Sequence, residues 1–384
     1  MGLKIGKVTG QYNRWRYTED LSYAGYSTVN LTKTPANTVT IYDGITPITL
    51  GQISSTNYYG SVTTNLSGLG LQPFVIGKKY FVSGYVKNDA DVERWFWPRY
   101  VGAGANAHGS CYMSITPRRY WTLLTATATN LPQPYWFFNG NGAINNATVT
   151  AYIGGFQIEL VPDDTKIGVS VMGDSTVAGS SGKKDAENSV EWTRWAEGWL
   201  NVPFYNRGVG GNTTQQMIDR WAADMTPLAG DPYYVKYTII QGGINDLPTQ
   251  TAEQIVTNLT TMRDLAIADG TIPVMCTISP CNKTGDEETV RNQANALIRS
   301  NFNLVIDLDL ILKDPANPNQ LHPDWVGDGT HFTALGKKAI GQYIANSGIM
   351  SFLQPSPYQK LATSPFSQYT DVSYKLSLSN SITL

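Results

Sequence analysis

Short polar stretches that could do chemistry recur where apolar runs end. Residues 167–176 read "IGVSVMGDST", so an apolar run stops at an Asp-Ser pair. Three later stretches have a similar placement: "YNRGVGGNTT" (205–214), "QGGINDL" (241–247) and "DGTHF" (328–332). Together the four supply a hydroxyl, glycine N–H groups, an amide and an Asp-x-x-His pair. Acyl transfer needs this set: a nucleophile, oxyanion donors, a base and a group that orients the base.

The side chains of the first and last stretches suggest specific roles. Ser175 is the candidate nucleophile, and His331 is the candidate base because histidine titrates near neutral pH. Asp328 precedes His331 by three residues, so one turn of chain can aim its carboxylate at the imidazole. A structural interpretation stands beside this one, because Asp or Ser after a strand commonly caps the next helix. These residues alone leave both interpretations of Ser175 open.

The middle stretches supply candidate donors for an oxyanion. We expect the backbone N–H groups of Ser175 and Gly211 and the side-chain amide of Asn245 to form the oxyanion hole, with Gly210 as the alternative to Gly211. Losing one such donor costs about 3 kcal/mol of transition-state stabilisation. Neighbouring polar residues are expected to contact substrate: Asp174, Asn212 and Asp246.

The elements that must position these residues follow an alternating pattern from Ile167 onward. Strand-like runs end at the polar stretches, and helix-like runs separate them near 189–200, 213–225, 251–269, 287–300 and 333–346. The third helical run begins "TAEQ", which is a capping-box pattern. Such alternation predicts a parallel sheet covered by helices, with ligands beyond the carboxyl ends of its strands. We therefore predict an α/β domain over residues 163–350.

The first part of the chain has a different pattern. Residues 1–162 show short aromatic or alternating runs separated by Gly, Pro, Asn and Thr, which predicts an all-β sandwich domain. Trp95 and Trp97 alternate with Phe96, so both should lie on one strand face, either filling the sandwich or stacking on sugar rings as substrate-binding residues. Residues 351–384 are predicted to be a tail or a strand that docks on a neighbouring subunit.

Composition excludes several classes of function. Charged residues make up 15% of the 384 residues and the net charge is −2, which argues against nucleic-acid or membrane-surface partners. The 22 Tyr and 10 Trp suit uncharged, sugar-like ligands. The first residues lack a signal-peptide pattern, and no apolar stretch has the length of a membrane span, so we expect a soluble protein. The three cysteines predict buried free thiols, and no residue cluster predicts a metal site.

The four polar stretches resemble the four blocks of the SGNH hydrolases, also called GDSL-type esterases. Ser175 matches the first block, Gly211 the second, Asn245 the third, and Asp328 with His331 the fourth. The resemblance covers residues 167 to about 346, in the family's order. It implies a three-layer α/β/α hydrolase that needs no metal or cofactor, with a serine that forms an acyl-enzyme. It favours the nucleophile interpretation of Ser175, although Asp174 can still cap the helix.

Two finer resemblances point to a substrate. "GDST" resembles the carbohydrate acetylesterase branch, and "RRYWTLLTATAT" with "YIGGFQIEL" resembles carbohydrate-binding jelly-roll modules of bacteriophage tail proteins. Together they imply an esterase that removes O-acetyl groups from an acetylated polysaccharide of a bacterial capsule or O-antigen. They also imply a trimeric tail-spike type protein that acts outside the cell after lysis. The alternatives are a lipid or thioester hydrolase, and a non-catalytic virion protein that binds a glycan receptor.

Overall fold

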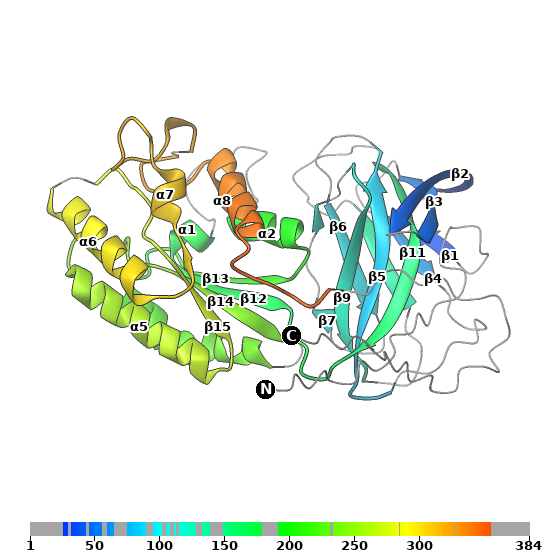
Figure 1. The fold of residues 1–384 in the computed structure, drawn as a ribbon, viewed down its shortest axis with the longest axis horizontal. Coiled ribbons are helices and arrows are strands. Elements are labelled where there is room, and N and C mark those ends of the chain that lie inside the picture. Colours follow the sequence, from blue (N-terminus) through cyan, green and yellow to red (C-terminus); the bar gives the residue numbers. More distant parts are fainter. Residues whose placement is uncertain are drawn as a thin grey trace, which may run out of the picture.

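The computed structural model of the chain describes residues 26–29, 32–43, 46–55, 60–64, 75–89, 95–101, 106–107, 111–112, 115–127, 133–138, 149–178, 191–230, 233–283, 285–325 and 327–354. Figure 1 shows two parts, with helices and one sheet on one side and strands on the other. The segment "VPDDTK" (161–166) joins them, because β11 (Val149–Val161) ends there and β12 (Gly168–Gly173) follows.

The helical part contains the predicted parallel sheet. Its strand order is β13-β12-β14-β15-β16, and every neighbouring pair is parallel. The other strands of this sheet are β13 (Phe204–Gly208), β14 (Val235–Gln241), β15 (Ile272–Cys276) and β16 (Val305–Ile306). Because β12 lies between β13 and β14, their carboxyl ends lie side by side, which brings three of the four polar stretches to one edge.

Helices cover both faces of this sheet (Figure 1). One face carries α1 (Ser175–Ala178), α2 (Trp192–Leu200), α7 (Leu308–Leu312) and α8 (Ala334–Asn346). The other carries α3 (Thr214–Asp219), α4 (Trp221–Asp224), α5 (Ala252–Ala268), α6 (Asp286–Asn301) and the 3₁₀ turn η1 (Thr226–Ala229). A second 3₁₀ turn, η2 (Pro323–Trp325), precedes α8. The described C-terminal half is therefore a three-layer α/β/α domain.

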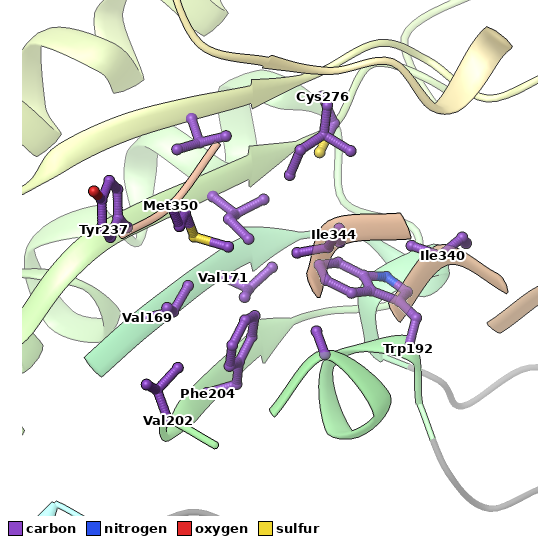
Figure 2. Packing of buried hydrophobic residues seen from close by; sticks show 14 of the residues in the cluster. Val169, Val171, Trp192, Val202, Phe204, Tyr237, Cys276, Ile340, Ile344 and Met350 are labelled. Carbon is purple, nitrogen blue, oxygen red and sulfur yellow. The ribbon is translucent and has the colours of Figure 1, made fainter. Parts of the chain in front are cut away.

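Strand alternation separates the two cores. Val169 and Val171 of β12 point to one face with Trp192 and Ile344, as Figure 2 shows, whereas Met172 belongs to the cluster on the other face. Side chains two residues apart on a strand share a face, so one buried strand feeds both cores. This explains why "IGVSVM" is an almost continuous apolar run, as expected for a strand that is buried on both sides.

Local sequence signals account for most helix boundaries. Thr251 and Gln254 form the predicted capping box at the start of α5. The helical spacing of Trp192, Trp195 and Trp199 favours core packing; Trp192 and Trp195 are buried, and Trp199 is partly exposed. The predicted helix over 213–225 is interrupted at Arg220, which separates α3 from α4. Asp307 follows the last residue of β16 and caps α7, because its side chain accepts the Leu310 N–H.

The described elements before Pro162 are strands in two sheets. Their orders are β1-β4-β10-β6-β8 and β2-β3-β11-β5-β9-β7, and every neighbouring pair is antiparallel. Besides β11 they are β1 (Tyr26–Val29), β2 (Thr32–Asp43), β3 (Thr46–Ser55), β4 (Gly60–Thr64), β5 (Lys79–Asn88), β6 (Trp95–Val101), β7 (Asn106–Ala107), β8 (Cys111–Tyr112), β9 (Arg118–Thr125) and β10 (Gln133–Phe138). The jelly-roll module and the domain limits stay predictions, and residues 355–384 lie outside the described part.

Apolar side chains join the β-rich part to the hydrophobic core of the α/β part. Phe81, Trp121 and Leu123 belong to the same buried cluster as Ile167 and Val202. The rings of Phe81 and Trp121 lie 4.9 Å apart and are tilted by 60°. Separating the two parts would expose this cluster to water, which opposes independent movement of the parts.

Polar contacts fix the same interface at the end of α2. Arg118 donates from Nη1 to the carbonyl of Gly198 at 3.1 Å and from Nη2 to the carbonyl of Trp199. Asn201 donates in return to the carbonyl of Arg119 at 3.1 Å. The last carbonyls of a helix lack partners within the helix, so the β-rich part supplies a cap for α2.

Close packing between α2 and α8 makes one substitution informative. A Cβ atom added at Gly341 would lie 2.3 Å from Trp195 Cβ and 2.8 Å from the Ala196 nitrogen. We expect Gly341→Ala to lower the free energy of unfolding by about 3 kcal/mol, because backbone atoms must move apart. Denaturant unfolding measures this effect. Gly230→Ala is the matched control, since no atom lies within 4 Å of its added Cβ, and an equal loss in both variants would contradict the packing argument.

None of the described helices has the length and hydropathy that a bilayer-spanning helix needs.

Candidate active site

The turn after β12 positions Ser175 at the first residue of α1. The carboxylate of Asp174 accepts the Thr176 N–H at 2.8 Å and the Thr176 hydroxyl at 2.6 Å, which caps the start of this short helix. A Cβ at Gly208 would lie 2.3 Å from the nitrogen of Ala178, so only glycine allows β13 to pass so close to α1. The capping interpretation thus applies to Asp174, and the hydroxyl of Ser175 remains partly exposed.

His331 reaches this hydroxyl from the loop between η2 and α8. Its Nε2 lies 2.8 Å from Ser175 Oγ, and its Nδ1 lies 2.7 Å from Asp328 Oδ2. The other carboxylate oxygen of Asp328 accepts the backbone N–H groups of Thr330 and His331, at 3.1 and 2.9 Å. Asp328 therefore both shapes the loop and orients the imidazole, in the order that a serine nucleophile, a general base and an orienting carboxylate require.

Hydrogen bonds also determine the charge of Asp328. Partial burial raises the pKa of this carboxyl, but the bonds from His331 and Thr330 outweigh burial and hold the pKa below its ordinary value. Asp328 is consequently ionised at neutral pH. An ionised carboxylate stabilises a neighbouring imidazolium, so the arrangement favours transfer of the serine proton to His331.

Two of the predicted oxyanion donors, Gly211 and Asn245, lie on turns that a hydrogen bond connects. Gly211 has φ +79°, a backbone conformation that glycine adopts without strain, and no atom lies within 4 Å of an added Cβ. Asn245 follows β14 and donates from Nδ2 to the carbonyl of Asn212 at 3.0 Å. The amide nitrogen carries two hydrogens and this contact uses one of them. The bond links the second polar stretch to the third, while the roles of Ser175, Gly211 and Asn245 as oxyanion donors stay predictions.

The α/β half of the chain matches a known protein family. Residues 171–339 match the model of the GDSL-like lipase/acylhydrolase family. These residues form a GDSL-like lipase/acylhydrolase domain. The match includes β12, the turn with Ser175, and the loop with Asp328 and His331. No curated protein matches the chain.

Several solved structures resemble this GDSL-like domain. A putative lipolytic protein of the G-D-S-L family from Desulfitobacterium hafniense is 21% identical, with a TM-score of 0.40, and the similarity covers 48% of this chain and 100% of that one. A lipase/acylhydrolase from Enterococcus faecalis is 20% identical, with a TM-score of 0.38, covering 48% and 95%. The acetyl xylan esterase AlAXEase is 16% identical, with a TM-score of 0.37, covering 47% and 100%.

Two predicted substrate contacts of the GDSL-like domain lie in its interior. Asp174 and Asp246 are each 1% exposed. Asp246 accepts the Thr214 N–H at 3.1 and 3.0 Å and the Thr214 hydroxyl at 2.6 Å, so it holds the start of α3. Burial raises the pKa of Asp246, although these bonds oppose it. Both carboxylates support backbone at the site, and their contact with a substrate stays a prediction.

The other predicted substrate-binding residues are Asn212, Trp95 and Trp97. Asn212 is partly exposed, but its side-chain oxygen accepts from Arg220 Nε at 2.7 Å and its carbonyl accepts from Asn245. Trp95 and Trp97 lie on β6, and their side chains are outside the described part. Their contact with sugar stays a prediction.

Arg220 is the residue that the sequence interpretation missed. It lies between α3 and α4 and donates to Gly173, Asn212 and Asp224. One signal was present, since Arg220 and Asp224 have the i,i+4 spacing of a helical ion pair. The sequence predicts one continuous helix over 213–225. It therefore does not predict the break at Arg220, which turns this side chain toward the site.

Three expectations about neighbouring residues are confirmed. Cys276 and Cys281 are buried free thiols. The sequence "QLHPDW" around His322 favours a hydrogen bond within its loop, and its Nδ1 atom accepts the Asp324 N–H at 3.3 Å. Burial of the thiols and the loop hydrogen bond of His322 therefore account for these side chains without a role in catalysis.

Asp174 makes stability depend on pH. Burial raises its pKa to about 6, and the hydrogen bonds from Thr176 and the nearby His331 only partly oppose this shift. The pKa of this carboxyl is higher in the folded state than in the unfolded state. Below the unfolded pKa the carboxyl is protonated in both states and its full contribution to stability is present. As pH rises from the unfolded pKa to about 6, that contribution is lost. We expect Asp174→Asn to increase the free energy of unfolding by at most about 3 kcal/mol near pH 8.

Urea unfolding followed by tryptophan fluorescence at about pH 8 and about pH 3 measures this difference. The gain should vanish near pH 3, where the wild-type carboxyl is protonated in both states. A gain of equal size at both pH values, or no gain at either, would show that the ionisation of Asp174 does not limit stability.

Proposed function

We propose that this protein is a serine esterase that removes O-acetyl groups from a polysaccharide. The observation that carries the proposal is the hydrogen-bonded series from Ser175 Oγ through His331 to Asp328, at 2.8 and 2.7 Å. Ser175 attacks the acetyl carbonyl while His331 takes its proton, and the oxyanion is held by N–H groups of Ser175 and Gly211 with the Asn245 amide. His331 returns the proton to the leaving sugar hydroxyl, and water then releases acetate from Ser175 by the reverse sequence.

The exposure of the site supports a large substrate with a small acyl group. The side chains of His331 and Asp328 are 21% and 49% exposed, and Gly210 and Gly211 are also exposed. A polymer cannot be enclosed, so its ester must be reached from the surface, whereas a long acyl chain gains affinity from a buried apolar cleft. The resemblance of "GDST" to carbohydrate acetylesterases favours the same substrate class.

The β-rich part gives further support for a polysaccharide. It is docked on α2 through Arg118 and Asn201, so a glycan bound there would keep a fixed position relative to Ser175. The resemblance to phage tail modules is the basis for a tail-spike role and for a trimer. Sedimentation analysis of the full chain tests the trimer, and a monomer at micromolar concentration would contradict it.

Two assays distinguish the candidate functions. The first measures acetate release from a panel of O-acetylated bacterial polysaccharides, and the second compares p-nitrophenyl esters from acetate to decanoate. The proposal predicts acetate release and the highest kcat/KM with the acetate ester. Activity that rises with chain length would indicate a lipid or thioester hydrolase. Polysaccharide binding without cleavage of any ester would indicate a receptor-binding protein.

A further inference from the structure

Arg220 connects α4 to two turns that lie beside proposed site residues. Its Nη2 donates to the carbonyl of Gly173 at 2.9 Å, its Nε donates to Asn212 Oδ1 at 2.7 Å, and its Nη1 donates to Asp224 Oδ2 at 2.6 Å. The side chain is 17% exposed, so water competes weakly for these bonds. A guanidinium presents its donors in a rigid plane, and three bonds of this kind fix the relative positions of the three acceptors.

Two of these acceptors belong to backbone that carries the proposed oxyanion donors. Gly173 lies two residues before Ser175, and its carbonyl also accepts the Val209 N–H at 3.0 Å. Asn212 follows Gly211 directly, and its own carbonyl accepts the amide of Asn245. Through these bonds a single side chain sets the spacing between all three proposed donors.

We propose that Arg220 is a positioning residue that holds the oxyanion hole in its reactive geometry. This inference rests on the proposed function, because it concerns the same site. Arg220 acts through Gly173 and Asn212, and nothing in its geometry requires contact with substrate. Donors that are fixed in advance stabilise the oxyanion without reorganisation during the reaction, so their loss lowers kcat more than it changes KM.

Arg220→Met and Arg220→Lys test the inference. Met keeps the length of the side chain without its donors, and Lys keeps the charge without the planar set of donors. We expect both to lower kcat for p-nitrophenyl acetate by about 10- to 100-fold, with KM changed by less than about threefold. Arg207→Met is the matched control, because Arg207 donates to the carbonyls of Asp224 and Asn206 at 3.4 Å, and within the described residues these bonds do not involve Gly173 or Asn212.

A double-mutant cycle separates positioning from general damage. Because Arg220 also holds Gly173, Arg220→Met should cost less than in wild type, but still measurably, once Asn245→Ala has removed the amide that the Asn212 turn holds. Losses that multiply in the double variant, or an Arg220→Met variant that is as active as Arg207→Met, would overturn the inference. A kcat that falls only in proportion to the folded fraction, measured by circular dichroism, would also overturn it.

The rate of labelling by diethyl p-nitrophenyl phosphate distinguishes failure of this inference from failure of the proposed function. Ser175 Oγ bonds to phosphorus, p-nitrophenolate leaves, and the serine proton passes to His331, so labelling needs the same oxyanion donors but no particular acyl group. Slower labelling of Arg220→Met than of Arg207→Met supports the inference. Equal rates overturn it alone, and an unlabelled wild-type Ser175 overturns both proposals.

Discussion

Ser175→Ala should abolish ester hydrolysis while the protein stays folded. We expect kcat to fall by about 10⁴- to 10⁶-fold, because the substitution removes the atom that bonds to the acyl carbon. His331 Nε2 then loses its partner at 2.8 Å, but among the described residues no backbone hydrogen bond depends on the hydroxyl. Acetate release from an acetylated polysaccharide and hydrolysis of p-nitrophenyl acetate both measure the loss.

Ser300→Ala is the control for this substitution. Ser300 lies on the exposed side of α6 and donates to the carbonyl of Leu297, so its removal should leave turnover unchanged. Thermal unfolding of both variants shows whether they are folded. A folded Ser175→Ala variant with turnover within about tenfold of wild type would exclude Ser175 as the nucleophile, since residual catalysis without it should be far weaker.

Asp328→Asn should have the second largest effect. We expect kcat to fall by about 10³-fold, because an amide can donate to Nδ1 of His331 and hold the wrong tautomer, with no charge to stabilise the imidazolium. The effect should be smaller than that of Ser175→Ala, since Asp328 is 49% exposed and water can partly replace it. The asparagine oxygen can still accept the N–H groups of Thr330 and His331, so the loop should keep its shape.

Asp324→Asn provides the matched control in the same loop. Its side chain is 72% exposed and lies 3.8 Å from His322, not His331. Steady-state kinetics with p-nitrophenyl acetate should therefore show wild-type kcat for this variant. Equal losses in the two variants would indicate that loss of negative charge from the loop, rather than orientation of His331, governs the rate.

The proposed catalytic residues could be predicted from the sequence because the patterns that identify them are local. Asp328 and His331 are three residues apart, and Ser175 directly follows a strand-like run, so strand ends and short spacing identified them. Their convergence follows from the parallel sheet, which places consecutive strand ends at one edge. The start of α5 could also be predicted from the sequence, because the capping box consists of four consecutive residues.

The residues that could not be predicted depend on contacts between distant segments. Arg220 interrupts a helical pattern because it bonds to Gly173, which lies 47 positions away. Asp174 and Asp246 looked accessible at strand ends, but the helices packed on the sheet bury them. The strand order of the first part is another example, because β11 pairs with both β3 and β5. Such pairings leave no mark in local composition.

The central claim is that His331 activates Ser175 for covalent attack. Intact-mass and peptide-mapping spectrometry after treatment with diethyl p-nitrophenyl phosphate tests it most directly. We expect one diethylphosphoryl group per wild-type chain, located on Ser175, and labelling at least about 10³-fold slower in His331→Ala. Label on another residue, or equal labelling of Ser175 in wild type and His331→Ala, would contradict the account.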